Sequence, residues 1–397
     1  MPSIVQRNPF VQPRIPAANT HADIEIWNRA VKESFAPFVR RRRILVESRQ
    51  ELRAELINLL PILDHPGLVK ALLESVRMCR KAIYLNSAAS HAHQVVHFSD
   101  TSRADDNWLG LCASMKPLDA NADLADRVTQ AMTEIDALAE GCLKPRIKCL
   151  FGFAHFLAHA SYPSRVRDFG ECIADWPTGI AGNLRGLMKD PAFGISISQW
   201  RNIAAHRSYL RTGPDIFQGA YGKKVRKTFT FNFAALQEVL AWSKQLLAVC
   251  RMANVIIYTE FMPELLLLGL PDISLRFDAF VVSLSHSLRM VGFTYFAEKQ
   301  ANGELAVLYQ DDLKREPKHA IVHASQVLDQ LAVVSNSDVA LRSVIKKVGI
   351  VLVTAEEIMY ASASVDVDVA LRWLSREISQ KQYIAQIDFW IAQGAVP

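Results

Sequence analysis

The segment from Gln199 to Arg211, QWRNIAAHRSYLR, combines side chains that can bind a phosphate and move a proton. Arg201 and His206 would lie about 140° apart around an ideal helix, because each residue turns the helix by about 100°. Asn202 and His206, at i and i+4, share one side of such a helix. A site that uses Arg201 and His206 together therefore needs the arginine to bend around the helix, or a second copy of the helix facing the first in a two-fold dimer.

These residue types are suited to cleaving RNA without a metal ion. The 2′-hydroxyl has to lose a proton so that its oxygen can attack the neighbouring phosphorus, and the 5′-oxygen has to gain one in order to leave. Histidine, with an ordinary pKa of about 6.5, can perform either transfer around neutral pH. Arg201 would bind the phosphate and stabilise its charge, and Asn202 would orient the imidazole or the phosphate. Arg207 and Arg211 follow closely and would guide the RNA backbone.

The spacing of the arginine and the histidine is a weak signal by itself. A second Arg-x(4–6)-His match runs from Arg14 to His21, in a proline-containing lead-in where no helix is expected. The central match is more specific, because a polar residue directly follows the arginine and apolar residues lead into the helix. RNIAAH resembles the signature of the HEPN superfamily. The segment from Leu124 to Tyr258 is similar to the HEPN layout of helices, motif, a short strand-like excursion and a closing amphipathic helix.

HEPN proteins are typically dimeric, all-helical bundles, and many are metal-independent endoribonucleases of toxin–antitoxin, abortive-infection and other antiphage systems. The resemblance implies a homodimer that cleaves RNA and leaves a 2′,3′-cyclic phosphate. Arg201, Asn202 and His206 would be its catalytic residues, with no metal and no cofactor. An antitoxin or a defence-system protein would be a further partner. Some HEPN proteins have lost catalysis, so the alternative is an inactive module that binds a nucleotide or a protein.

Two histidine groups are candidates for metal binding. One is the set His91, His93, His97 and Asp100. The other is the pair in HFLAH, His155 and His159, which lacks the glutamate of an HExxH zinc hydrolase. Ligands one helical turn apart are common in metal sites, but neither group has a convincing third and fourth ligand. We therefore favour packed or surface histidines and predict no metal site.

The charge balance permits a nucleic-acid partner. The chain of 397 residues has a net charge of +5 and an isoelectric point of about 8.8. Its densest basic run, from Arg40 to Arg43, is either a solvated helix face or a phosphate-binding patch. No phosphate-binding P-loop, dinucleotide fingerprint or nucleophile elbow is present, which leaves ATP hydrolysis, dinucleotide redox chemistry and α/β-hydrolase chemistry unsupported.

The composition predicts a cytoplasmic protein. The six cysteines form no CxxC pair and are typical of buried thiols in a reducing compartment. The first ten residues do not have the pattern of a signal peptide. The apolar run 265–270 is too short to span a bilayer, so no membrane association is expected.

Helical periodicity dominates the first two thirds of the chain. It predicts helices over 24–60, interrupted at Pro37, and over 67–87, 124–140 and 145–161, with a polar connection between 97 and 123. A helix capped by Ser196 or Ser198 carries the Arg-Asn-His segment. The alternating run 225–233 predicts a strand, and Asn232 caps the helix that follows.

The C-terminal part is predicted to contain an apolar helix over 272–290, a hairpin over 292–310 that turns at Asn302-Gly303, and three closing helices. The expected fold is therefore mainly α, a helical bundle or bundles with short β-hairpin decorations. Three regions are expected: an N-terminal helical region at 1–123, a HEPN-like domain at 124–258 and a C-terminal helical region at 259–397.

Overall fold

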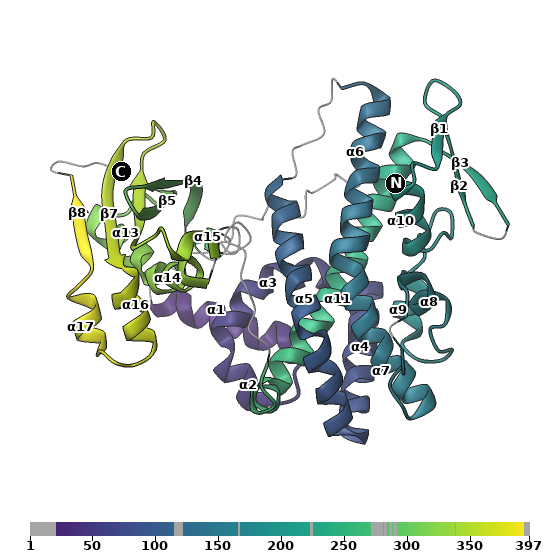
Figure 1. Cartoon of the computed structure of the whole chain (residues 1–397), viewed down its shortest axis with the longest axis horizontal. Coiled ribbons are helices and arrows are strands. Elements are labelled where there is room, and N and C mark those ends of the chain that lie inside the picture. Colours follow the sequence, from purple (N-terminus) through teal and green to yellow (C-terminus); the bar gives the residue numbers. More distant parts are fainter. Residues whose placement is uncertain are drawn as a thin grey trace. The chain divides into compact units, whose positions relative to one another are not determined.

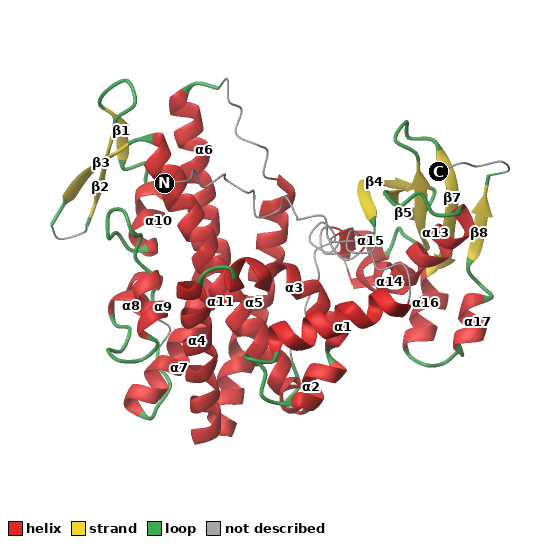
Figure 2. Cartoon of the chain, turned by 180° about the vertical axis from the view of Figure 1, so that it is seen from behind, coloured by secondary structure: helices red, strands yellow, loops and turns green. Residues whose placement is uncertain are grey.

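The computed structural model describes residues 21–114, 122–165, 167–222, 225–270, 281, 284–285, 288, 292–337 and 339–392. The chain forms two compact units. The helical unit comprises residues 29–273, and the mixed-sheet unit comprises residues 274–397 together with the residues before Arg29. Helices make up most of the first unit, and a five-stranded sheet forms the centre of the second (Figures 1 and 2).

The described part of the first unit consists mainly of α-helices and one π-helix. They are α1 (His21–Phe35), which begins before the unit boundary, α2 (Arg42–Glu47), α3 (Arg49–Leu63), α4 (Pro66–Leu85), α5 (Ser87–Ser114), α6 (Leu124–Ala137), the π-helix η1 (Leu138–Leu143), α7 (Lys144–His159), α8 (Phe169–Ala174), α9 (Gly182–Leu187), α10 (Ile197–Ala205) and α11 (Phe233–Leu267). The predicted end of the first helix near Pro37 is confirmed, because proline disfavours the helical conformation of the residue before it. The helix predicted over 67–87 is confirmed as α4.

α11 is the central helix of this unit, and α3 to α7 and η1 pack around it (Figure 1). Its predicted cap is confirmed, since the Asn232 side chain accepts a hydrogen bond from Ala235 N at 2.9 Å. Apolar side chains surround most of its circumference, as in helices that are buried on all sides. Within the described residues, α11 alone is long and apolar enough to cross a membrane. However, 67% of its apolar window is buried inside the protein, which is typical of a core helix in a soluble protein.

The predicted polar connection between 97 and 123 is wrong for residues 97–114, which continue α5. Asp105 of this segment forms ion pairs with two neighbouring helices, whereas Asp100 and Arg103 pair with each other and are exposed. Asp105 binds Arg146 of α7 and Arg251 of α11, each at 2.7 Å. The periodicity of apolar residues cannot predict ion pairs between segments that are distant in the sequence. Residues 115–121 lie outside the described part of the chain.

A small antiparallel sheet follows α10. It contains β1 (Tyr209–Arg211), β2 (Phe217–Tyr221) and β3 (Lys227–Phe231) in that order. The strand predicted over 225–233 is confirmed as β3. β1 and β2 were not predicted, because they are short and the segment around them contains glycine and proline. Figures 1 and 2 show this sheet beside α10, at the edge of the helical unit.

The mixed-sheet unit has strands β4 (Phe293–Ala301), β5 (Glu304–Asp311), β6 (Lys347–Val353), β7 (Met359–Asp366) and β8 (Asp388–Ile391), in that spatial order. Its helices are α13 (Pro317–Ala324), η2 (Ser325–Val327), α14 (Leu328–Ser337), α15 (Val339–Arg342), α16 (Val367–Leu374) and α17 (Gln380–Ile384). β5 and β6 are parallel and are joined through α13, α14 and α15, and all other neighbours are antiparallel. Side chains of β5, β6, β7, α13 and α14 form most of the core.

The hairpin predicted over 292–310 is confirmed as β4 and β5. Its turn residues Asn302 and Gly303 have φ angles of 51° and 76°, which a two-residue type I′ turn requires. The helix predicted over 272–290 falls largely on residues outside those that the structure describes.

The predicted fold class is nevertheless wrong. A mixed sheet of five strands and a second sheet of three are more than hairpin decorations, and the chain is not all-α. The main error concerns β6, KVGIVLV, which is buried along most of its length and therefore lacks the alternation of a half-exposed strand. A short apolar run of this kind cannot be distinguished from a buried helix by periodicity.

The units and the predicted regions divide the chain at different places. Residues 124–258 lie inside the helical unit, which also contains α2 to α5 from the predicted region 1–123. The predicted region 259–397 begins within α11 and continues through the mixed-sheet unit.

Candidate functional site

α10 carries Arg201 and Asn202, and a buried carboxylate fixes its start. Asp190, only 2% exposed, accepts hydrogen bonds of 2.6–2.9 Å from four N–H groups: the main-chain groups of Ala192, Phe193 and Ile195 and the indole of Trp200. Ser196 caps the helix by accepting from Gln199 N, which confirms one of the two predicted caps. These contacts set the direction in which α10 leaves the loop.

α10 ends at Ala205, so His206 is the C-cap residue and lies beyond the last helical residue. Arg207 N donates to Ala204 O at 3.1 Å, and Ser208 N donates to Ile203 O at 2.9 Å. This pair of bonds is the Schellman motif, in which glycine usually occupies the position of Arg207. Arg207 has a φ angle of 48°, a left-handed conformation that disfavours residues with a Cβ atom. The turn leaves the His206 side chain exposed at the end of the helix.

Arg201 points toward the junction of α6 and η1. Its guanidinium donates to Glu140 at 2.9 Å and lies 3.8 Å from an Asp136 carboxylate oxygen. A third contact, of 3.1 Å, joins it to the Asn202 side-chain oxygen. Glu140 also pairs with Lys144, four residues further along. The Arg201 side chain is 31% exposed, so one side of this charged group faces solvent.

The charges of both Arg201 and His206 contribute to the electrostatic environment of Asp136. Partial burial raises the pKa of Asp136 above its ordinary value, and the charge of Glu140 adds to this effect. The charges of Arg201 and His206 both oppose it, which means that both side chains lie within electrostatic reach of Asp136. The pKa of Glu140 is lowered: burial opposes this shift, but the hydrogen bond from Lys144 and the charges of Lys144 and Arg201 outweigh it.

The 140° separation expected for Arg201 and His206 does not apply, because His206 lies outside the helix. A single chain therefore presents both residues near Asp136, with the arginine held by the carboxylates of η1 and α6. Asn202 lies in the last part of α10 and accepts from Arg201 through its side chain, while its carbonyl accepts from His206 N at 3.1 Å.

The two arginines expected to guide RNA have different environments. Arg207 is exposed directly beside His206. Arg211 is exposed on β1, but its guanidinium donates to the main-chain carbonyls of Gly213 and Pro214 in the turn that follows. Arg211 therefore stabilises its own turn in this structure, and Arg207 is the one with its side chain facing solvent next to the motif.

Sequence reasoning missed Asp136, Glu140 and Lys144. Their spacing of four residues is a detectable signal, because it repeats a charged residue on one side of a helix. What the spacing does not reveal is the partner, which comes from a helix some sixty residues later in the chain. The π-helix η1, a rare element that is frequent at functional sites, also lies here and holds Glu140.

The histidines of α5 and α7 are packed rather than assembled around a cation. His93 hydrogen-bonds to the Cys149 carbonyl at 2.9 Å, stacks on Tyr162 with ring centres 4.4 Å apart, and meets His97 at 4.6 Å. Burial lowers the pKa of His93 to about 3, and the neighbouring His97 adds to this shift.

The second candidate pair lies near the surface, since His155 is partly buried and His159 is exposed. His155 and His159 lie with their rings 4.4 Å apart, and His155 hydrogen-bonds to the Ser161 carbonyl. Among the described residues, no group of three or more His, Cys, Asp or Glu side chains could hold a metal ion.

The arginine run from Arg40 to Arg43 contributes to the fold. Glu260, fully buried, accepts from Arg40 N and Arg41 N and forms an ion pair with the buried Arg80. Arg41 pairs with Glu264 and stacks over Phe261 with its guanidinium carbon 4.4 Å from the ring centre. This half of the run therefore anchors the segment before α2 to α11.

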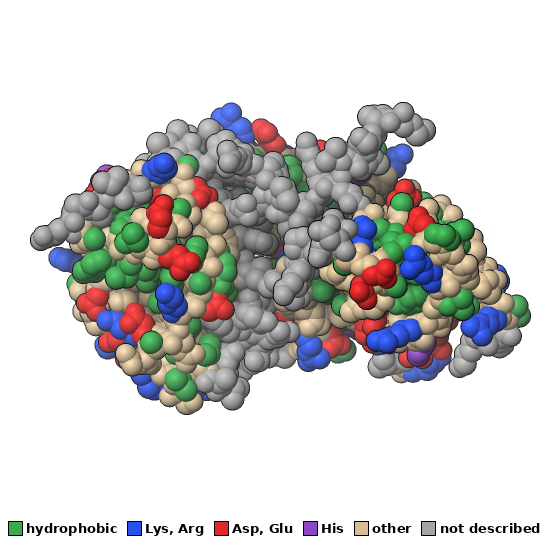
Figure 3. Space-filling model, turned by 90° about the horizontal axis from the view of Figure 1, so that it is seen from above, with side chains coloured by type: hydrophobic (Ala, Val, Ile, Leu, Met, Phe, Trp, Pro, Cys, Tyr) green, Lys and Arg blue, Asp and Glu red, His purple; other side chains and the backbone are tan. Residues whose placement is uncertain are grey.

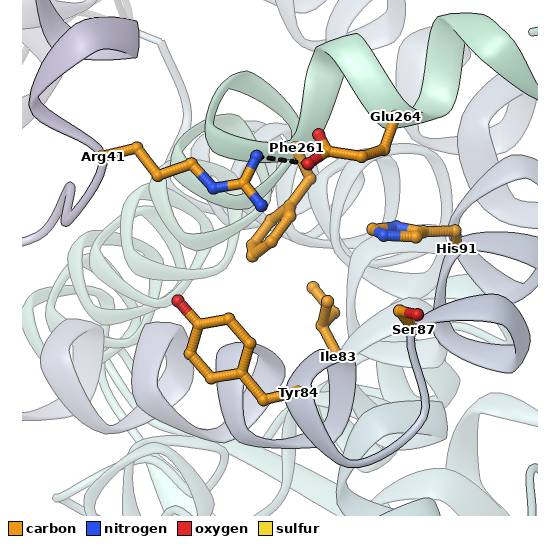
Figure 4. A pocket seen from close by; sticks show the side chains of 7 residues that line it. All are labelled: Arg41, Ile83, Tyr84, Ser87, His91, Phe261 and Glu264. Carbon is orange, nitrogen blue, oxygen red and sulfur yellow. Dashed lines mark hydrogen bonds and ion pairs between the residues drawn. The ribbon is translucent and has the colours of Figure 1, made fainter.

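A cavity of about 420 Å3 lies beside this anchor. Figure 4 shows three of its lining residues, Arg41, Glu264 and His91, around the upper part of the cavity, with Ile83, Tyr84 and Ser87 below them. A second cavity, of about 440 Å3, is lined by Arg41, Arg42, Arg43, Ile44 and Pro263. Neither cavity includes a residue of the Arg-Asn-His segment.

On the face shown in Figure 3, the basic side chains of the described residues are interspersed with acidic and hydrophobic ones. Comparison of the chain with family models, with curated proteins and with solved structures gives no match. The likeness to HEPN proteins therefore depends on the RNIAAH motif and its setting alone.

Proposed function

We propose that the protein is a metal-independent endoribonuclease of the HEPN type that acts in antiphage defence, in abortive infection or as a toxin. The observation that supports this proposal is the placement of Arg201 and His206. The arginine side chain is partly exposed, His206 is exposed, and the charges of both act on Asp136 near the end of α6. A phosphate bound by Arg201 would therefore have a group for proton transfer beside it.

In the proposed reaction, the 2′-hydroxyl loses its proton, its oxygen bonds to the adjacent phosphorus, and the bond from phosphorus to the 5′-oxygen breaks. His206 removes the first proton or supplies the one that the leaving 5′-oxygen needs. Arg201 stabilises the charge that develops on the non-bridging oxygens. Asn202 holds the guanidinium at 3.1 Å and so positions it. The products carry a 2′,3′-cyclic phosphate and a 5′-hydroxyl.

One observation favours the alternative of an inactive HEPN-like module that binds a nucleotide or a protein. Glu140 and Asp136 already neutralise Arg201, so a phosphate has to compete with these carboxylates. If the enzyme is active, the form in which these carboxylates bind Arg201 is its resting state. RNA or a second copy of the chain, which would bring a second Arg201 and His206 to the site, would then have to displace the carboxylates.

The remaining assignments follow from the proposed activity. The enzyme would act on cytoplasmic RNA as a homodimer, and an antitoxin or another defence-system protein would restrain or trigger it. Neither a metal nor a cofactor takes part in the proposed chemistry.

The test is cleavage of total RNA and transfer RNA by the purified protein in EDTA, beside Arg201→Ala and His206→Ala variants. Discrete fragments from the unaltered protein, and a loss of at least about 100-fold in each variant, are expected for a general acid–base and phosphate-binding pair. Both side chains are at least partly exposed, so the melting temperatures should be unchanged. Equal cleavage by all three proteins would refute the assignment of this site.

The inactive alternative has its own signature. It predicts no cleavage by any of the three proteins at any enzyme concentration. It also predicts that strong expression of the unaltered chain is tolerated by the host, whereas an active nuclease should be toxic unless it is restrained.

A further inference from the structure

The net charge of the chain is concentrated in one short segment. Residues 205–232, which contain the β1–β3 sheet, hold six basic residues and one acidic residue, a net charge of +5. The whole chain also has a net charge of +5, so the charges of all other residues sum to zero. The basic residues of this segment are Arg207, Arg211, Lys223, Lys224, Arg226 and Lys227.

Three basic side chains that the structure describes lie at one end of the sheet, where β1 and β3 both start, and all three are exposed. Arg207 precedes β1, and Arg226 and Lys227 stand at the start of β3. Within the described residues, none of these three forms an ion pair, in contrast to Arg201. The single acidic residue of the segment, Asp215, lies in the connection between β1 and β2. These cations are therefore available to a polyanion.

The β1–β3 sheet is firmly attached to the helix that carries the motif. Phe229 of β3 meets the Trp200 ring at 5.3 Å between centres, and Phe231 meets it at 6.3 Å. Phe231 stacks in turn on Phe217, its partner in the strand register. Trp200 is fully buried and hydrogen-bonded to Asp190. One face of the sheet thus packs on α10 and holds the strands in a fixed position relative to Arg201 and His206.

The other face carries short polar side chains. Gln218 and Thr230 are paired across the strands and lie on the opposite side from Phe229 and Phe231, and Thr228 shares this side. Both threonines are exposed. Hydroxyl and amide groups beside lysines and arginines are the usual donors to phosphate and sugar oxygens.

We propose that the β1–β3 sheet binds the sugar–phosphate backbone of single-stranded RNA and leads it to the end of α10. Arg207, next to His206, and Arg226 with Lys227, at the start of β3, bind successive phosphates along this path. The inference deepens the proposed nuclease function and depends on it for the identity of the polyanion. It also explains how a chain with balanced charge elsewhere would attract RNA to this one surface.

The experiment measures binding of the full chain to a fluorescent single-stranded RNA of about 20 nucleotides with 2′-O-methyl groups, which cannot form a cyclic phosphate. The binding constant is determined by anisotropy at several salt concentrations for the unaltered protein and for an Arg226→Ala/Lys227→Ala variant. The matched control is Lys318→Ala/Lys381→Ala, which removes two exposed positive charges from the mixed-sheet unit. Melting temperatures verify that all three proteins are folded.

The sheet variant is expected to bind about tenfold more weakly at low salt. The slope of log affinity against log salt should fall by about 1.4, because each lost contact to a single strand removes about 0.7. The control should retain the affinity and the slope of the unaltered protein. An equal loss in the control, unchanged binding by the sheet variant, or no salt-dependent binding by the unaltered protein would each overturn the proposal.

Binding of a DNA strand of the same sequence tests whether the surface prefers RNA. Tighter binding to DNA than to RNA would refute the assignment to RNA. The two proposals also fail separately. If the sheet variant loses binding while the unaltered protein cuts no natural RNA in EDTA, the binding surface is supported and the nuclease activity is refuted. If cleavage depends on Arg201 and His206 but the sheet variant binds RNA as tightly as the unaltered protein, only the nuclease proposal is supported.

Discussion

His206 and His93 lie in the same unit and have opposite environments. His206 is exposed at the C-cap of α10, where the chain turns toward β1. His93 is enclosed between α5 and α7, hydrogen-bonded to the Cys149 carbonyl and stacked on Tyr162. Gly152 of α7 makes room for its ring: a Cβ atom at this position would lie 2.2 Å from a ring carbon of His93.

Histidines that are close together in the sequence therefore do not by themselves indicate a catalytic site. The segment around His93 is the richer one, with three histidines and an aspartate within ten residues, yet burial keeps its central imidazole neutral. Charging a group in a low-dielectric interior is unfavourable, so such a ring packs and does not exchange protons near neutral pH. The isolated His206, which has solvent on one side and Arg201 nearby, is better suited to proton transfer.

The sharpest test of this comparison is His93→Ala beside His206→Ala. His93→Ala should lower the free energy of unfolding by about 2 kcal/mol, because it removes a partly buried ring that stacks on Tyr162 and its hydrogen bond to the Cys149 carbonyl. Urea denaturation measures this loss. Below the melting temperature the variant should still cleave RNA, whereas His206→Ala should be stable and inactive. A His93→Ala variant that is as stable as the unaltered protein but does not cleave RNA would contradict this assignment of the two histidines.

The packing of His93 predicts a strong effect of Gly152→Ala. The added methyl group would overlap the His93 ring, and relief requires α5 and α7 to separate, which should cost about 2 kcal/mol. The double variant Gly152→Ala/His93→Ala should be less destabilised than the sum of the two single variants, because the clash disappears with the ring. Additive losses would show that the two residues do not press against each other. Gly67→Ala, where no atom lies within 4 Å of the added Cβ, is the control.

The lowered pKa of His93 predicts that the protein loses stability on acidification. Because its pKa is about 3 in the folded protein and about 6.5 when unfolded, the unfolded chain binds more protons between these values. This contribution is present above pH 6.5 and declines by about 1.4 kcal/mol per pH unit as the pH falls toward 3. A His93→Gln variant should show a correspondingly weaker dependence between pH 6.5 and 5 in urea denaturation. Identical pH profiles would mean that His93 is not buried as a neutral ring.

The smallest expected effect concerns the turn beside His206. Arg207→Gly should raise the free energy of unfolding by about 1 kcal/mol, because glycine adopts the left-handed conformation without the Cβ penalty. It should also weaken RNA binding if Arg207 contacts phosphate. Arg207→Ala separates the two effects, since it removes the cation and keeps the Cβ atom. A stability gain with unchanged binding would limit the role of Arg207 to the turn.

Much of the helical unit could be predicted from the sequence, because local interactions decide its elements. The spacing of apolar residues located α4, the cap residues Ser196 and Asn232 marked the starts of α10 and α11, and Asn302-Gly303 marked the turn between β4 and β5. Arg201, Asn202 and His206 could be selected as candidates in the same way. The mixed sheet could not, because a strand buried along most of its length, such as β6, has no alternating pattern.

Local sequence sets which side chains can do chemistry and where most elements begin and end, since propensity, capping and turn geometry act over a few residues. The environment of those side chains comes from the tertiary structure instead. It pairs Arg201 with Glu140 across about sixty residues, packs His93 against α7 while His206 stays exposed, and sets the β1–β3 sheet beside α10. The physical reason is that burial and ion pairing depend on contacts between segments distant in the chain, and these contacts leave no local pattern.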